Sequence, residues 1–121
     1  MSLLRRLRLK YAKRKPRNLD EAIEALNYIL SFEDKQLFQE QNEKKFINST
    51  HHHLGRWIRN NWELWNEKSK LAEWFIAKEI WHADDMSAII LTSYWRKIHG
   101  QPIRLEKQIQ RYFKFWLRHD H

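Results

Sequence analysis

The sequence contains no cysteine, and only two glycines and two prolines, in 121 residues. Without cysteine the chain can form no disulfide framework, no thiolate metal site and no thiol nucleophile. Domains built from β-strands need many tight turns, which use glycine and proline, so the scarcity of both favours helices. No run of about 20 apolar residues is present, which argues against a transmembrane segment.

The N-terminus is basic, but no continuous apolar segment follows it, so it does not have the pattern of a secretory signal. Together with the lack of cysteine, this leads us to expect a cytoplasmic protein. An organellar presequence is also rich in arginine and poor in acids, and that alternative stays open.

Apolar residues make up 42% of the chain and include seven Trp, six Phe and four Tyr. Each aromatic side chain that becomes buried removes about 150–250 Å² from water. One domain of this length can therefore build a hydrophobic core without a covalent or metal crosslink. We expect no cofactor.

Positive charge is concentrated at the N-terminus. Residues 1–17 contain eight Lys or Arg and no acid, while the rest of the chain carries 15 Lys or Arg and 15 Asp or Glu. The eight cations are Arg5, Arg6, Arg8, Lys10, Lys13, Arg14, Lys15 and Arg17. We therefore predict two parts: a basic amphipathic arm over residues 1–17, with a short helix over 3–14, and a single helical domain over 18–121.

Apolar residues recur at helical spacing through the whole of the predicted domain, and no stretch alternates with a period of two. The pattern predicts an all-α, compact bundle of five or six helices. The expected helices cover residues 19–30, about ten residues after Ser31, then 43–61, 70–80, 85–99 and about 103–118.

Residues that begin and end helices stand at the expected boundaries. Asn18, Ser31 and Ser69 are predicted N-caps. Gly100 stands where a left-handed glycine would end a helix, and Pro102 is predicted to be the first residue of the last helix.

The side chains of Leu37 and Phe113 are predicted to face the core. Gly55, in the middle of the expected helix 43–61, indicates a close approach between two helices.

Four stretches carry a resemblance to a known family: LDEA at 19–22, EDK at 33–35, HHHLGRWIRNNWELW at 51–65 and HADDMSAII at 82–90. They are similar to the pattern L-D-E-A, E-D-K, H-x-x-L-G-x-W-I-R-N-N-W-x-L-W and H-P-D-D-M-S-x-I-I of small bacterial proteins defined as a domain of unknown function. Ala83 stands where that pattern has proline. The resemblance covers residue 18 to about 115, and it implies a common fold and a common polar site but no reaction.

His51, His82, Asp84 and Asp85 are the candidate metal ligands, since imidazole and carboxylate suit Zn, Fe or Mn. Neighbouring residues of a helix point about 100° apart, so the triplet at 51–53 cannot converge on one ion. The structural alternative is favoured: Asp84 and Asp85 fall in the first turn of a helix, where carboxylates oppose the helix dipole. His51 is expected to be a hydrogen-bonded structural residue.

Five residues are predicted to contact a partner. Arg56, Arg59 and Asn60 share one helical face and could bind carboxylate or phosphate, although pairing inside the fold is the alternative. Trp65 and Trp81 lie near turns, so they are the tryptophans expected at the surface.

No nucleophile elbow and no glycine-rich phosphate loop is present. The first hypothesis is therefore a non-enzymatic interaction protein that binds another macromolecule, most readily a protein, with the basic arm assisting attachment. The second is nonspecific binding of nucleic acid through residues 5–17, or of an anionic membrane through the same arm. The third is a metal-dependent hydrolase or nuclease that uses His51, His82, Asp84 and Asp85.

Overall fold

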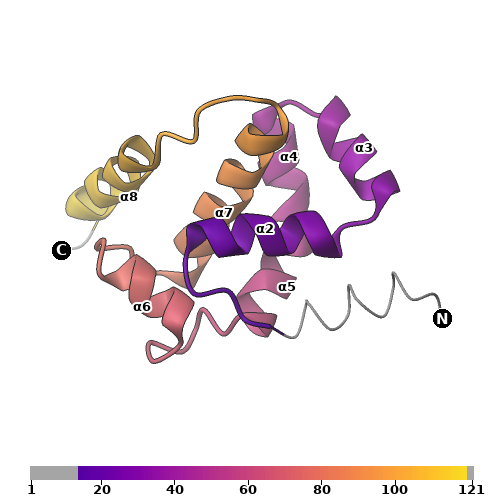
Figure 1. The fold of residues 1–121 in the computed structure, drawn as a ribbon. Coiled ribbons are helices and arrows are strands. Elements are labelled where there is room, and N and C mark those ends of the chain that lie inside the picture. Colours follow the sequence, from indigo (N-terminus) through magenta and orange to yellow (C-terminus); the bar gives the residue numbers. More distant parts are fainter. Residues whose placement is uncertain (1–13, 120–121) are drawn as a thin grey trace.

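The computed structural model describes residues 14–119, so the predicted helix 3–14 and most of the basic arm lie outside the described residues (Figure 1). This part of the chain contains seven α-helices and no strand. The helices are α2 (Leu19–Ile29), α3 (Phe32–Glu40), α4 (Glu43–Thr50), α5 (Leu54–Asn61), α6 (Lys70–Ile76), α7 (Ala83–Ile98) and α8 (Leu105–His119). The all-α prediction is confirmed, whereas the predicted number of five or six helices is too low.

Helix α7 is the centre of the molecule, and each of the other helices packs against it (Figure 1). Nine of its sixteen residues are buried, including Ile89, Ile90 and Tyr94. A helix that is covered on most of its circumference has little polar face, which explains the mainly apolar sequence from Met86 to Leu91. None of the helices within residues 14–119 is long and apolar enough to cross a membrane.

The predicted N-caps are confirmed. The side-chain oxygens of Asn18, Ser31 and Ser69 accept hydrogen bonds from the backbone N–H three residues later, in α2, α3 and α6 respectively. Asn42 caps α4 in the same way. Each such cap is worth about 1 kcal/mol, so together they fix where four of the helices begin.

The predicted helix 43–61 is wrong, because residues 51–53 form a turn between α4 and α5. In a continuous helix the carbonyl of His51 would accept from the N–H of Gly55. Here that carbonyl instead accepts from the guanidinium of Arg59, at 3.0 Å. A buried arginine thus takes a carbonyl acceptor that a continuous helix would have used. The predicted helix is therefore divided into α4 and α5, which raises the number of helices to seven within residues 14–119.

The ends of α6 and the start of α8 also differ from the prediction. Helix α6 ends at Ile76, not at residue 80, and Glu79 then adopts a left-handed backbone with φ of 66°. Gly100 has φ of 66° just after α7, as predicted. Pro102 is not the first residue of the last helix, since Arg104 is left-handed with φ of 54° and α8 begins at Leu105.

Two residues predicted to face the core are exposed instead. The exposed fraction is 52% for Leu37 and 44% for Phe113. Leu37 lies on α3 and Phe113 on α8, two helices at the edge of the molecule. The buried residue of α3 is Phe38, and the buried residue of α8 is Gln108. Each helix presents apolar side chains to solvent as well as to the core, where α8 also contributes the partly buried Leu105, Ile109 and Tyr112.

Candidate interaction surface

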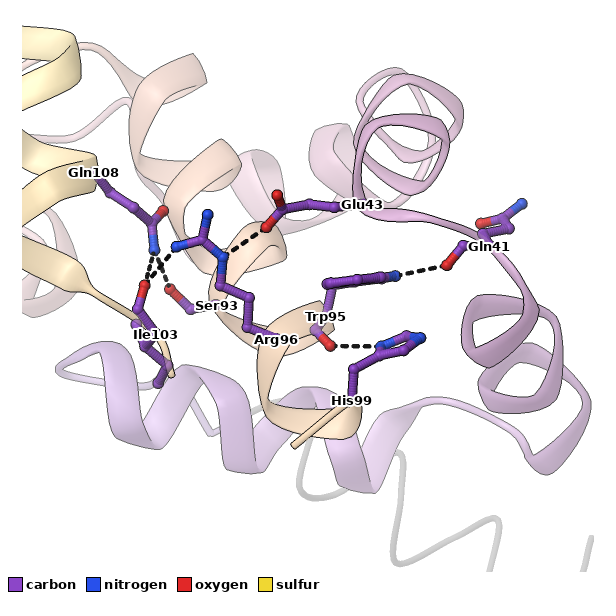
Figure 2. Close-up of polar contacts among 8 residues, drawn as sticks. All are labelled: Gln41, Glu43, Ser93, Trp95, Arg96, His99, Ile103 and Gln108. Atoms are coloured by element: carbon purple, nitrogen blue, oxygen red, sulfur yellow. Dashed lines mark hydrogen bonds and ion pairs between the residues drawn. The ribbon is translucent and has the colours of Figure 1, made fainter. Parts of the chain in front are cut away.

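Helix α8 is held in place by a set of polar contacts to the end of α7, which Figure 2 shows in close-up. The side-chain amide of Gln108, which is buried, donates to Ser93 Oγ at 3.2 Å and to the carbonyl of Ile103 at 2.9 Å. Arg96 donates to the same carbonyl at 2.7 Å and to Glu43 Oε1 at 2.6 Å. Because the anchors come from α4, α7 and the segment before α8, the position of α8 is fixed by the body of the molecule.

A groove of about 600 Å³ lies between α8 and the connection from α6 to α7. Its lining residues are Glu79, Ile80, Trp81, His82, Asp85, Phe113, Trp116 and Leu117. Most of these side chains are apolar or aromatic, and the lining contains no Lys or Arg. A groove with such a lining suits an apolar side chain of a ligand or partner.

The floor of this groove is formed by residues that contact one another. The ring of His82 stacks on the ring of Trp116, with centroids 3.8 Å apart and planes at 18°. Trp116 Nε1 donates to Asp85 Oδ2 at 2.8 Å. Burial raises the pKa of Asp85, and the hydrogen bond from Trp116 offsets part of that effect. His82, just before α7, and Asp85, in the first turn of α7, thus both contact the one tryptophan of α8.

The rim of the groove exposes large apolar side chains. The exposed fraction is 62% for Trp81, 61% for Leu117 and 44% for Phe113. Single exposed apolar residues are common, whereas here three of them surround one groove.

A row of four cations runs along the outer face of α8. Lys107, Arg111, Lys114 and Arg118 follow one another at intervals of four, three and four residues, so they lie on one face, and all are exposed. Within residues 14–119 none of them forms an ion pair. Phe113 and Leu117 of the rim lie beside the row of cations on α8, while Trp81 of the rim belongs to the connection from α6 to α7. The rim, the row of cations and the groove are together called the α8 surface.

The sequence analysis predicted the last helix at about 103–118, close to the observed α8, but it did not predict that this helix contributes to a site. It named Trp81 as a partner contact and His82 and Asp85 as metal candidates, and did not group the three. Phe113 was assigned to the core, and the balanced charge of residues 18–121 hid the cations of this helix. Counting charge helix by helix would have found them, since α8 carries four Lys or Arg and one Glu.

Arg59 is buried and has a structural role. Its guanidinium donates to Ser87 Oγ at 2.8 Å and to the carbonyl of His51 at 3.0 Å, and it pairs with Asp84 at 3.3 Å. With an exposed fraction of 4%, it offers no surface to a partner. The alternative of pairing inside the fold therefore describes Arg59.

Arg56 and Asn60 are exposed on α5, and Trp65 lies beside Asn60. Trp65 Nε1 donates to Asn60 Oδ1 at 3.2 Å, while the ring remains 63% exposed. The prediction that Trp65 and Trp81 reach the surface is confirmed. They do not share a site, because Trp65 is not part of the groove, and partner contact through Arg56, Asn60 or Trp65 stays a prediction.

The four candidate metal ligands are each engaged in other contacts. Asp84 pairs with Arg59, Asp85 accepts from Trp116, and His82 stacks on Trp116. The pKa of His51 is lowered, first by burial and then by the charge of Arg59. Within residues 14–119 no group of three or more His, Asp or Glu is arranged to hold a metal ion. Asp84 and Asp85 lie in the first turn of α7, as the structural alternative predicts.

Three cations of the predicted arm lie within the described residues. Lys15 pairs with Glu63 at 2.6 Å, and Arg17 pairs with Glu21 at 2.9 Å. Arg14 is also exposed. Arg5, Arg6, Arg8, Lys10 and Lys13 lie outside the described residues. Part of the arm is therefore tied to the body, although exposed pairs of this kind contribute only about 0–1 kcal/mol each.

The fold and the α8 surface together define a small all-helical domain that exposes an amphipathic surface. Residues 15–98 match the family described as Domain of unknown function (DUF6794), and the chain belongs to this family. The match ends before α8, which begins at Leu105. Searches of the curated proteins and of the solved structures each returned no match.

Proposed function

We propose that this protein is a non-enzymatic interaction protein that binds another polypeptide through the α8 surface, with the basic residues 5–17 assisting attachment. One observation carries the proposal. One helix carries exposed apolar side chains and four cations that form no ion pair within residues 14–119, and it lies beside a groove that is already formed.

The chemistry of the surface defines the partner. The groove and its rim suit an apolar or aromatic side chain, and the neighbouring cations suit carboxylates. The preferred segment is therefore a stretch of polypeptide that presents apolar and acidic side chains together.

The contacts inside the groove support binding. The contacts among His82, Asp85 and Trp116 hold the floor in place before a partner arrives. Little side-chain freedom is then lost on binding, which favours affinity. Trp81, large and exposed at the rim, is the residue expected to contribute most, as tryptophans often do at interfaces.

Selection from a random peptide library on the immobilised full chain tests the proposal. Enriched peptides should combine aromatic or aliphatic residues with Asp or Glu. They should bind Leu117→Asp at least tenfold more weakly than the unmodified chain. Trp65→Ala, which alters an exposed tryptophan outside the groove, should bind as the unmodified chain does. Enriched peptides that bind Leu117→Asp as tightly as the unmodified chain, but no longer bind Trp65→Ala, would show that the α8 surface is not the binding site.

The row of cations on α8 supports a second candidate, the binding of a polyanion such as nucleic acid. The row adds up to four phosphate contacts to those of the predicted arm. Each phosphate neutralised on duplex DNA changes the slope of log affinity against log salt by about 0.9. Reversal of Lys107 and Lys114 to Glu should then flatten the slope measured with a duplex. Liposome flotation with anionic vesicles distinguishes lipid binding from nucleic-acid binding. A salt slope that does not change in the Lys107 and Lys114 variant would rule out nucleic-acid binding through α8.

A further inference from the structure

Helix α3 presents an outer face that mirrors α8 with the opposite charge. Phe32 and Leu37 are 68% and 52% exposed. Glu33 and Glu40 lie on the same outer face, and within residues 14–119 neither forms an ion pair. Its neighbour α2 adds to this charge, because α2 and α3 together contain six acids and one Lys.

The charges on the two helices also have the same spacing. Glu33 and Glu40 are seven residues apart, and so are Arg111 and Arg118. Seven residues of α-helix span about 10.5 Å, so the two pairs can face each other when the helices lie side by side. Leu37 lies between the two acids on α3 and on nearly the same face, so an apolar side chain separates the two ion pairs on that helix.

One molecule cannot make this contact with itself, because α3 and α8 lie at opposite ends of the domain (Figure 1). We propose that the α8 surface of one copy binds the outer face of α3 of a second copy. This proposal rests on the proposed function, and it names the partner as another molecule of the same chain.

The geometry sets the kind of assembly. A contact between two different surfaces of the same chain leaves one surface of each kind free in every dimer, so further copies can add until a ring closes. A face of nine residues on α3 buries less than the about 800 Å² per partner of a standard stable interface. Association should therefore be weak, at concentrations of roughly 10 µM to 1 mM, and should weaken further with salt.

Charge reversal tests the proposal. One variant carries Arg111→Glu and Arg118→Glu, a second carries Glu33→Lys and Glu40→Lys, and a third carries all four changes. The third has the same formal net charge as the unmodified chain, so it controls for a general effect of charge. Average mass is measured by analytical ultracentrifugation over the stated concentrations, after nuclease treatment, and circular dichroism establishes that each variant is folded.

The unmodified chain and the fourfold variant should both gain mass with concentration, and each twofold variant alone should stay monomeric. A mixture of the two twofold variants should associate again. An unmodified chain that stays monomeric, or a fourfold variant that fails to recover association, overturns the proposal. Association that disappears on nuclease treatment also overturns it and points to nucleic acid on α8.

The two proposals fail separately. If self-association is absent while library peptides still bind in a manner that depends on Leu117, only the choice of partner is wrong. If Leu117→Asp changes neither peptide binding nor association, the assignment of the α8 surface as the binding site is wrong.

Discussion

Asp85 shows how one side chain can serve both the fold and the surface. It lies in the first turn of α7, where a carboxylate is favoured by the helix dipole, and it fixes Trp116 of α8 through a hydrogen bond. Burial nevertheless disfavours its charged form and raises its pKa. The same carboxyl therefore links the stability of the domain to pH.

The sign of this link follows from the raised pKa. The folded state holds the proton of Asp85 more tightly than the unfolded state. Its contribution to stability is therefore fully present below the unfolded pKa of about 3.9, and it is lost as pH rises through the folded value. Asp85→Asn keeps an acceptor for Trp116 and cannot ionise. Relative to the unmodified chain, the free energy of unfolding of Asp85→Asn should increase as pH rises from about 4 towards 7.

Urea denaturation at a series of pH values measures this difference. Asp20→Asn, on an exposed position of α2, corrects for the general effect of removing a carboxylate. A difference between Asp85→Asn and the unmodified chain that stays constant over the whole range would contradict the prediction.

At the scale of the elements, the break between α4 and α5 depends on Arg59 and Gly55. A Cβ on Gly55 would lie 3.0 Å from Arg59 Nη1, 3.3 Å from the carbonyl oxygen of Thr50 and 3.5 Å from Leu91 Cδ1. The predicted close approach at this glycine is confirmed by these contacts. The guanidinium can turn away only by giving up its bonds to Ser87 and His51.

Gly55→Ala should therefore lower the free energy of unfolding by about 1–2 kcal/mol, although alanine is the better helix former. Arg59→Met should lower it by about 2–4 kcal/mol, because charge-assisted hydrogen bonds are lost and Ser87 loses its donor. The double variant should lose less than the two effects added together, since the methyl group no longer meets a guanidinium. Urea denaturation of the four proteins gives the coupling, and Arg56→Met on the exposed face of α5 is the matched control. Additive effects would show that Thr50, not Arg59, limits the space.

Helix boundaries were predictable from the sequence where local chemistry decides them. Asn18, Ser31 and Ser69 cap their helices with their own side chains, and Gly100 ends α7 through its backbone freedom. The break at residues 51–53 was not predictable, because its cause is a carbonyl taken by an arginine eight residues further on. Spacing alone also does not tell the core side of α3 or α8 from the side that is left exposed.

For the candidate site, the sequence predicted the exposure of the segment before α7 better than that of α8. Trp81 was expected at the surface because it lies near a turn, and it is there. The role of Trp116 was not predictable, since its contacts to His82 and Asp85 join residues about 30 positions apart in the chain.

For the whole molecule, the free energy of unfolding of truncated chains can locate the boundary between the arm and the domain. The sequence predicts it at residue 17, yet Pro16 is buried and the backbone N–H of Arg17 donates to Glu21 at 3.0 Å. Removal of residues 1–13 should change the free energy of unfolding by less than about 0.5 kcal/mol. Removal of residues 1–17 should lower it by about 1 kcal/mol, because a buried ring and a hydrogen bond are lost.

Urea denaturation of the two truncated chains tests the boundary. Equal stability of both chains would place the edge of the domain at residue 17, as predicted. A large loss on removing residues 1–13 alone would mean that the domain begins earlier.

The exposed indole of Trp81 has a practical consequence. Its emission depends on the polarity around it, so a partner segment that covers the rim should shift its fluorescence to shorter wavelength. Trp65→Phe removes the other strongly exposed indole and leaves Trp81 as the main solvent-facing emitter. The protein thus carries its own optical probe, and occupancy of the groove can be titrated without any added label.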